Sequence, residues 1–76
     1  MADSKKLNRE LIAKKMKRLR GERTQKEVAD AVGITPMAMS YYESGERMPT
    51  DNVKAKLAQY FGVSVGYLFF DEKVNS

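Results

Sequence analysis

Cysteine and histidine are both absent from the 76 residues of this sequence. Without them, the common zinc sites, paired cysteine and histidine nucleophiles and serine–histidine–aspartate triads cannot be built. The carboxylates are scattered along helix positions that we expect to be exposed, so the sequence predicts no metal site, no cofactor and no enzymatic activity. Small exported domains usually rely on disulfide bonds, and we therefore expect this chain to reside in the reducing cytoplasm.

Long hydrophobic runs are missing as well. No apolar stretch approaches the roughly 20 residues that a helix needs to cross a bilayer, and the polar N-terminal segment lacks the apolar centre of a signal peptide. We therefore expect neither membrane insertion nor export. Hydrophobic residues make up 42% of the chain and charged residues 32%, a balance typical of a folded globular domain. At this length we expect a single domain.

Positive charge exceeds negative charge, with a formal net charge of +4 at pH 7. The acidic residues are spread through the sequence, whereas basic residues concentrate between positions 14 and 23. Such a patch is typical of a surface that meets phosphates, and it is equally typical of a solvated helix face. Charge alone leaves both interpretations open. The basic segment comprises Lys14, Lys15, Lys17, Arg18, Arg20 and Arg23.

Capping residues and apolar periodicity predict five short helices joined by tight turns. The first helix is expected from Asn8 to Arg20, and Gly21 ends it. Its expected buried stripe comprises Leu11, Ile12, Met16 and Leu19. The other four helices are expected to begin at the caps Thr24, Thr35, Thr50 and Ser64. The chain is thus divided into a flexible N-terminus (1–7), a folded domain (8–70) and a polar tail (71–76).

The second and third predicted helices form the most informative part of the sequence. Thr24 and Glu27 fit a capping box, in which each side chain accepts a hydrogen bond from the other residue's exposed backbone N–H. Gly33 supplies the turn between the helices, because glycine adopts a positive φ at little cost. Met39 and Tyr42 are expected to pack the third helix against the second.

The opposite face of the third helix is expected to point outward. It carries Pro36, Met37, Ser40 and Tyr41. A short helix held clear of its domain in this way fits the major groove of DNA, which is about 12 Å wide. Helical hairpins of this length are also common in proteins that bind no DNA, so the periodicity by itself leaves the function open.

The whole stretch TQKEVADAVGITPMAMSYYESGERMPT resembles the Xre family, the five-helix domain of lambdoid phage repressors and Cro proteins. The resemblance extends from about Ile12 to Phe70, and LAQYFGVSVGYLF resembles the last two helices of the family. It implies an all-α, lambda-repressor-like fold with a helix-turn-helix in its second and third helices. The landmarks are Gln25, Val28, Ala29, Gly33, Ile34, Met39, Tyr42, Glu43, Ser44, Gly45, Arg47 and Pro49.

The resemblance also implies a function. We expect a bacterial or phage transcriptional regulator that binds double-stranded DNA. More specifically, we expect a repressor that acts as a homodimer on a pseudo-palindromic operator. No small-molecule ligand is expected. The alternative is a protein-interaction module on the same fold, an anti-repressor or adaptor without DNA binding.

Individual roles follow from the same resemblance. Arg20 and Glu43 are expected to form a structural ion pair, although a different register of the first helix would give that role to Arg18. The residues expected to contact DNA bases are Thr35, Met37, Ala38, Ser40 and Tyr41. The residues expected to contact phosphates are Gln25, Lys26, Ser44 and Arg47.

The third helix departs from the usual pattern, because it is poor in the Arg, Gln and Asn side chains that read bases. Three interpretations stay open. Met37 and Ala38 pack on thymine methyl groups, or DNA shape carries the specificity, or the face binds a protein. At the C-terminus, Phe70 and Val74 are candidates for a dimer contact, with a local hydrophobic clasp as the alternative.

Overall fold

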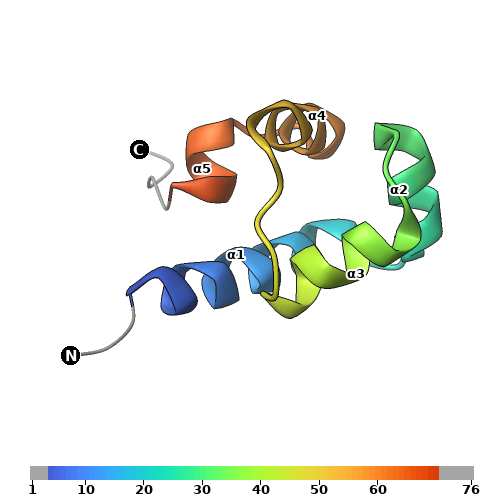
Figure 1. The fold of residues 1–76 in the computed structure, drawn as a ribbon. Helices are drawn as coiled ribbons and strands as arrows, with labels where there is room; N and C mark the ends of the chain where they lie inside the picture. Colours follow the sequence, from blue (N-terminus) through green and yellow to red (C-terminus); the bar gives the residue numbers. More distant parts are fainter. Residues whose placement is uncertain (1–3, 71–76) are drawn as a thin grey trace.

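The computed structural model describes residues 4–70, and their side chains from Asn8 onward. All the regular secondary structure in this range is helical, which confirms the predicted all-α, five-helix fold (Figure 1). The helices are α1 (Ser4–Arg20), α2 (Gln25–Val32), α3 (Pro36–Ser44), α4 (Asp51–Phe61) and α5 (Val65–Phe69).

The first helix differs from its prediction in two ways. It begins at Ser4, so residues 4–7, assigned above to the flexible N-terminus, are helical. The segment between Ser4 and Arg20 contains neither glycine nor proline, and nothing local stops the helix from extending backward. Leu11 was expected in the buried stripe but is 43% exposed, and the buried residues of this face are Ile12, Ala13 and Met16.

The predicted caps of the other helices are confirmed. The side-chain oxygens of Thr24, Thr35, Thr50 and Ser64 each accept a hydrogen bond from a backbone N–H in the first turn of the helix that follows. Such bonds satisfy donors that have no partner within the helix. Short helices of this kind depend on caps and on tertiary packing, because they are too short to be stable alone.

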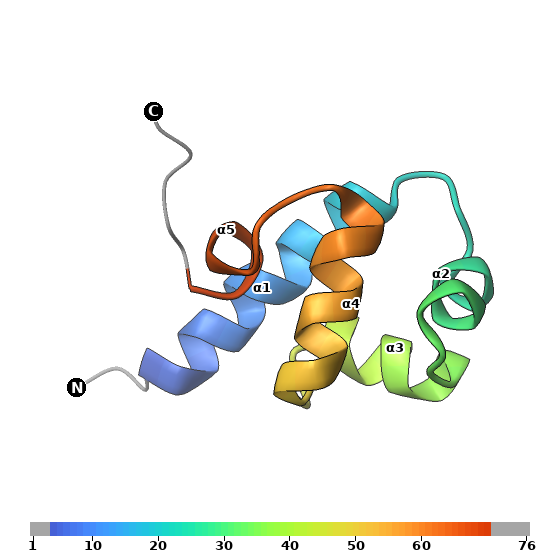
Figure 2. The same cartoon turned by 90° about the horizontal axis from the view of Figure 1, so that it is seen from above.

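Figure 2 shows how the helices are arranged. The central helix, α4, lies between α5 on one side and α2 on the other, and it contacts both. The pair α2 and α3 is packed together, and α3 also contacts α1. Since α1 contacts α5 as well, the helices close around one interior, and α3 stays at the edge of the molecule.

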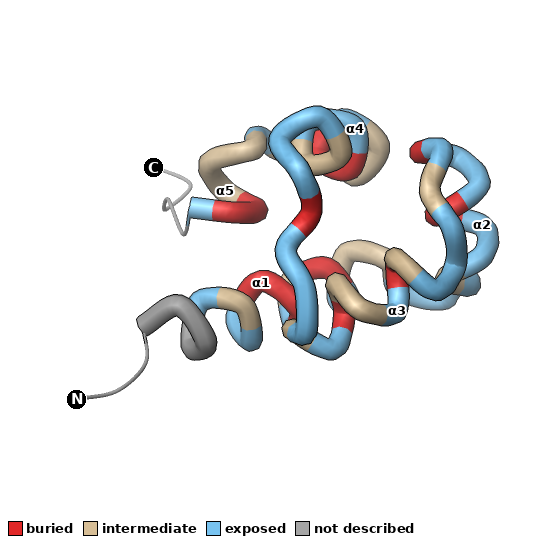
Figure 3. Tube along the Cα trace, in the orientation of Figure 1, coloured by how far each residue is buried: buried red, intermediate tan, exposed pale blue. Residues whose placement is uncertain are grey.

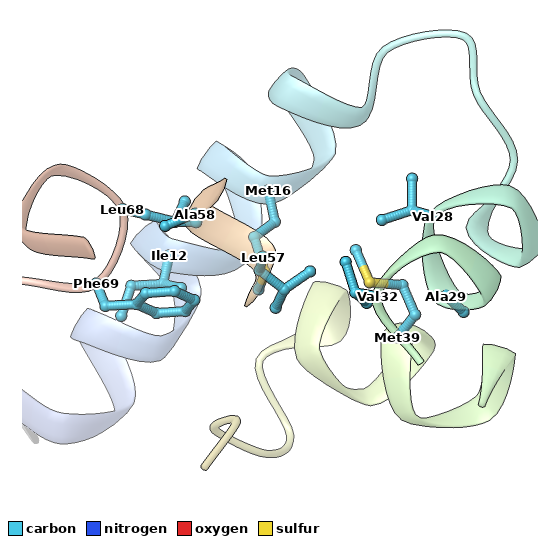
Figure 4. Packing of buried hydrophobic residues seen from close by; sticks show 10 residues of the cluster. All are labelled: Ile12, Met16, Val28, Ala29, Val32, Met39, Leu57, Ala58, Leu68 and Phe69. Atoms are coloured by element: carbon cyan, nitrogen blue, oxygen red, sulfur yellow. The ribbon is translucent and has the colours of Figure 1, made fainter. Parts of the chain in front are cut away.

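All five helices contribute to the core (Figure 4). Met16, Val28, Met39, Leu57 and Leu68 are its largest fully buried side chains. Buried and exposed stretches alternate along α1, as expected for amphipathic helices (Figure 3). Within residues 4–70, no helix is long and apolar enough to cross a membrane, and no cluster of acidic side chains is placed to hold a metal ion.

Candidate nucleic-acid interface

The turn between α2 and α3 fixes how the third helix is presented. Gly33 ends α2 with φ of 79°, a left-handed conformation that favours glycine. The next backbone N–H, that of Ile34, donates to the carbonyl of Ala29 at 2.9 Å. Met39, which follows the turn in α3, is fully buried in the core. These contacts hold the inner face of α3 against α2 and leave its outer face free.

The outer face of α3 carries the residues that were expected to contact bases. Met37 is 66% exposed, and Thr35 and Ser40 are exposed as well. Ala38 and Tyr41 are half-buried. The oxygen of Thr35 accepts a hydrogen bond from the Ala38 backbone N–H at 3.0 Å, which leaves the hydroxyl hydrogen available to an outside acceptor.

A surface hollow of about 210 Å³ lies on this face. It brings four of the five predicted base-contacting residues together with Arg47, a predicted phosphate contact, and it does not include Ser40. We call it the α3 hollow. Its lining residues are Thr35, Met37, Ala38, Tyr41, Tyr42 and Arg47.

The side chain of Arg47 is held by an aromatic ring. Its guanidinium carbon lies 4.7 Å from the centroid of the Tyr41 ring, within the range of a cation–π interaction. The backbone reinforces this arrangement, because the N–H groups of Glu46 and Arg47 both point to the carbonyl of Tyr41. A residue expected to contact a base and one expected to contact a phosphate are therefore physically linked.

The carboxylate of Glu43 lies at the centre of a hydrogen-bond network that ties α1, α2 and α3 together. Arg20 binds it with two bonds, Nε to Oε2 at 2.7 Å and Nη2 to Oε1 at 2.9 Å. Gln25 donates to Oε1 at 3.0 Å. The structure thus pairs Glu43 with Arg20 and not with Arg18, and the carboxylate raises the pKa of Arg20 above its ordinary value.

At the N-terminus of α2, two side chains expected to contact phosphate instead contact other residues of the protein. Gln25 and Lys26 were both expected to contact phosphate, but the Gln25 amide lies on Glu43 and the Lys26 ammonium lies 2.8 Å from Asp30. The Asp30 carboxylate raises the pKa of Lys26 by this hydrogen bond, which is exposed and therefore weak. The first backbone N–H groups of a helix have no acceptor within the helix, and such an end favours negative charge.

Ser44 is exposed at the C-terminus of α3, as a phosphate contact must be. Its hydroxyl donates to the Tyr41 carbonyl at 3.0 Å and accepts from the Glu46 N–H at 3.3 Å. Contact with a phosphate would therefore require the hydroxyl to rotate away from the carbonyl.

The sequence did not single out Lys14 and Lys17 within the basic segment, but the structure does. Both are exposed, and both line a hollow of about 190 Å³ that also includes Ser44 and the acidic residues Glu10 and Glu43, the latter paired with Arg20. Two cations from α1 are thereby placed beside a predicted phosphate contact on α3. Nothing in the sequence pattern shows this, because it depends on how α1 crosses α3.

Other basic residues of the segment make contacts within the protein that stabilise the fold. Lys15 donates to the carbonyl of Tyr67 at 2.7 Å. Arg23 donates to the carbonyls of Leu19 and Arg20, and its guanidinium lies 5.0 Å from the centroid of the Tyr60 ring. The basic segment therefore contains both structural cations and exposed ones.

The proposed dimer contact is only partly described by the structure. Phe69 is buried whereas its neighbour Phe70 is 62% exposed, with the Lys54 ammonium 5.3 Å from its ring centroid. Val74 lies outside the described residues.

Comparisons with known proteins agree with this geometry. A helix-turn-helix family model matches residues 12–68, which include all of α2, the turn and α3. The chain is also 33% identical, over 67 residues, to the cryptic phage CTXphi transcriptional repressor RstR of Vibrio cholerae. That match covers 86% of this chain and 60% of the repressor. No solved structure matches the chain.

Proposed function

Since the chain belongs to the Xre-type helix-turn-helix family of transcription regulators, we propose that it represses transcription by binding a pseudo-palindromic operator as a homodimer. The observation that carries this proposal is the outer face of α3, a helix at the edge of the molecule (Figure 2), which forms the α3 hollow together with Arg47. The proposal places the protein in the cytoplasm of a bacterial cell, where it acts on host or phage DNA.

In this proposal, α3 enters the major groove and its neighbours bind the backbone of the duplex. Arg47, Lys14 and Lys17 supply positive charge, and the N-terminus of α2 supplies backbone N–H donors. These contacts fix the position of the protein on DNA without reading its sequence. The side chains of α3 then read the base edges, and the bound protein blocks access to a promoter.

The homodimer follows from the symmetry of the operator that we propose. Two copies related by a twofold axis would place their α3 helices in successive major grooves, about 34 Å apart. Phe70 is the exposed aromatic residue that we propose for the contact between the copies.

Selection from a random duplex pool tests this function. The protein is incubated with the pool at low salt, bound duplexes are recovered over several rounds, and the enriched sequences are aligned. We expect one half-site motif repeated in inverted orientation, with its centres about one helical turn apart. Failure to retain any duplex at low salt would contradict the proposal and favour a protein-interaction module.

The link between Tyr41 and Arg47 gives a prediction about non-specific binding. Tyr41→Ala is expected to weaken binding to an unrelated duplex about threefold, because Arg47 loses the ring that holds it. Tyr41→Phe keeps the ring and should bind that duplex as the wild type does. The measurement is fluorescence anisotropy, including the double variant Tyr41→Ala/Arg47→Ala. Strictly additive losses in the double variant would show that the two residues act independently.

A further inference from the structure

The α3 hollow has an unusual chemical character for a surface expected to face nucleic acid. Met37 offers it a flexible thioether chain and Ala38 a methyl group, and two tyrosine rings line it together with Thr35 and Arg47. Met37 is among the most exposed hydrophobic side chains of the described residues, at 66%. An exposed methionine at the tip of a helix is adaptable apolar surface that lacks a partner in the free protein.

We propose that the α3 hollow receives the 5-methyl group of a thymine in the operator, an inference that rests on the DNA-binding function proposed above. In the major groove, thymine is the base that presents a methyl group, next to its O4 acceptor. A methyl group placed against Met37 and Ala38 would leave water for an apolar surface, which is favourable. Thymine is therefore the base whose edge matches this lining.

The hydrogen-bonding groups of the hollow argue against a purine at this place. Guanine and adenine both present N7 as an acceptor there, and guanine adds O6. The guanidinium of Arg47, the strongest donor of the lining, is held over the Tyr41 ring. Met37 and Ala38 themselves carry no donor, so a purine N7 pressed against these two side chains would lose its water without replacement, and an unsatisfied polar group is costly.

The surroundings of the hollow favour DNA over an apolar protein segment as the occupant. Arg47 belongs to the lining itself and packs on Tyr41, and Lys14 and Lys17 lie beside Ser44 at the C-terminus of α3. A methyl-bearing base next to phosphates complements an apolar hollow with cations toward the C-terminal end of α3. The charge pattern thus selects the partner, and the apolar lining selects the base.

Replacing thymine by deoxyuridine tests the inference, because the exchange removes the 5-methyl group and preserves every hydrogen bond. Each thymine of a duplex recovered from the random pool is replaced in turn, and affinities are measured by fluorescence anisotropy. We expect one position per half-site at which the loss is about fourfold, the value of one buried methyl or methylene group. Replacing that position in both half-sites should weaken binding about 15-fold.

Two protein variants tie this loss to the hollow. In Met37→Ala, thymine and deoxyuridine duplexes are expected to bind nearly equally, because the apolar wall that covers the methyl group is gone. Met48→Ala is the matched control, since it removes the same kind of side chain from an exposed position that does not line the hollow. It should retain the full fourfold difference. Both residues are exposed, and circular dichroism will establish that both variants are folded.

The outcomes separate this inference from the function on which it rests. A duplex that is bound specifically but tolerates deoxyuridine at every position, or that contains no enriched thymine, overturns the thymine assignment alone. An unchanged deoxyuridine penalty in Met37→Ala also overturns it. If no duplex is bound specifically, the proposed function itself is wrong.

Discussion

Glu43→Ala is expected to lower the free energy of unfolding by about 2–3 kcal/mol, which for a domain of this size corresponds to a fall in Tm of about 10–20 °C. Glu43 is 2% exposed, and its carboxylate accepts hydrogen bonds from Arg20 and Gln25. Removing it leaves the Arg20 guanidinium without its counter-ion. The Arg20 side chain retains 21% exposure, and partial hydration places the loss at or just below the lower limit of the roughly 3–5 kcal/mol usual for a broken buried pair.

Two further variants make this stability prediction specific. The double variant Arg20→Met/Glu43→Leu should recover much of the loss, because a well-packed apolar pair can replace a buried ion pair. Lys26→Ala removes an ion pair that is exposed, so it should leave the urea midpoint unchanged. Urea titration followed by circular dichroism measures all three. A Glu43→Ala midpoint equal to that of the wild type would show that the network does not stabilise the fold.

The second large effect is expected in the salt dependence of DNA binding. If a dimer neutralises about six to eight phosphates, its affinity should fall about 10³–10⁴-fold between 50 and 200 mM salt. The physical cause is the release of counter-ions from the duplex when Arg47, Lys14 and Lys17 bind its phosphates. Anisotropy titrations across this range give the log–log slope. A slope near zero would contradict phosphate binding.

Charge-removing variants assign that slope to particular residues. Lys14→Ala/Lys17→Ala should make it shallower by about one unit for each phosphate that the protein no longer neutralises. Lys15→Met removes the same kind of charge from the same helix, but Lys15 is turned toward the carbonyl of Tyr67. It should leave the slope unchanged. If Lys15→Met reduced the slope as much per removed charge as Lys14→Ala/Lys17→Ala does, the slope would depend on net charge and not on where the lysines lie.

Much of the fold could be predicted from the sequence because its determinants are local. A threonine or serine before a helix, and a glycine after it, act through hydrogen bonds and backbone angles within a few residues. The caps at Thr24 and Thr35 and the left-handed Gly21 and Gly33 were therefore predictable. The exposure of Leu11 was not predictable, because its neighbour Ile12 has similar hydrophobicity. Only the way in which other helices cross α1 decides which of the two residues is buried.

The candidate site was less predictable because it depends on contacts between distant segments. The Gln25 amide lies on Glu43, 18 positions away, and Arg9 donates to the carbonyl of Gly45, 36 positions away. The placement of Arg47 over Tyr41 depends on the path of the chain after α3. Residue types alone could assign these side chains to a surface, but not to each other.

The outer face of α3 is the feature on which the account depends, and a comparison of affinities tests it most directly. The protein is titrated at one salt concentration against a labelled duplex enriched from the random pool and against a shuffled duplex of the same base composition. Sequence reading by α3 predicts that the enriched duplex binds at least about 10³-fold more tightly. Equal affinity for the two duplexes, or no binding to either, would contradict the account.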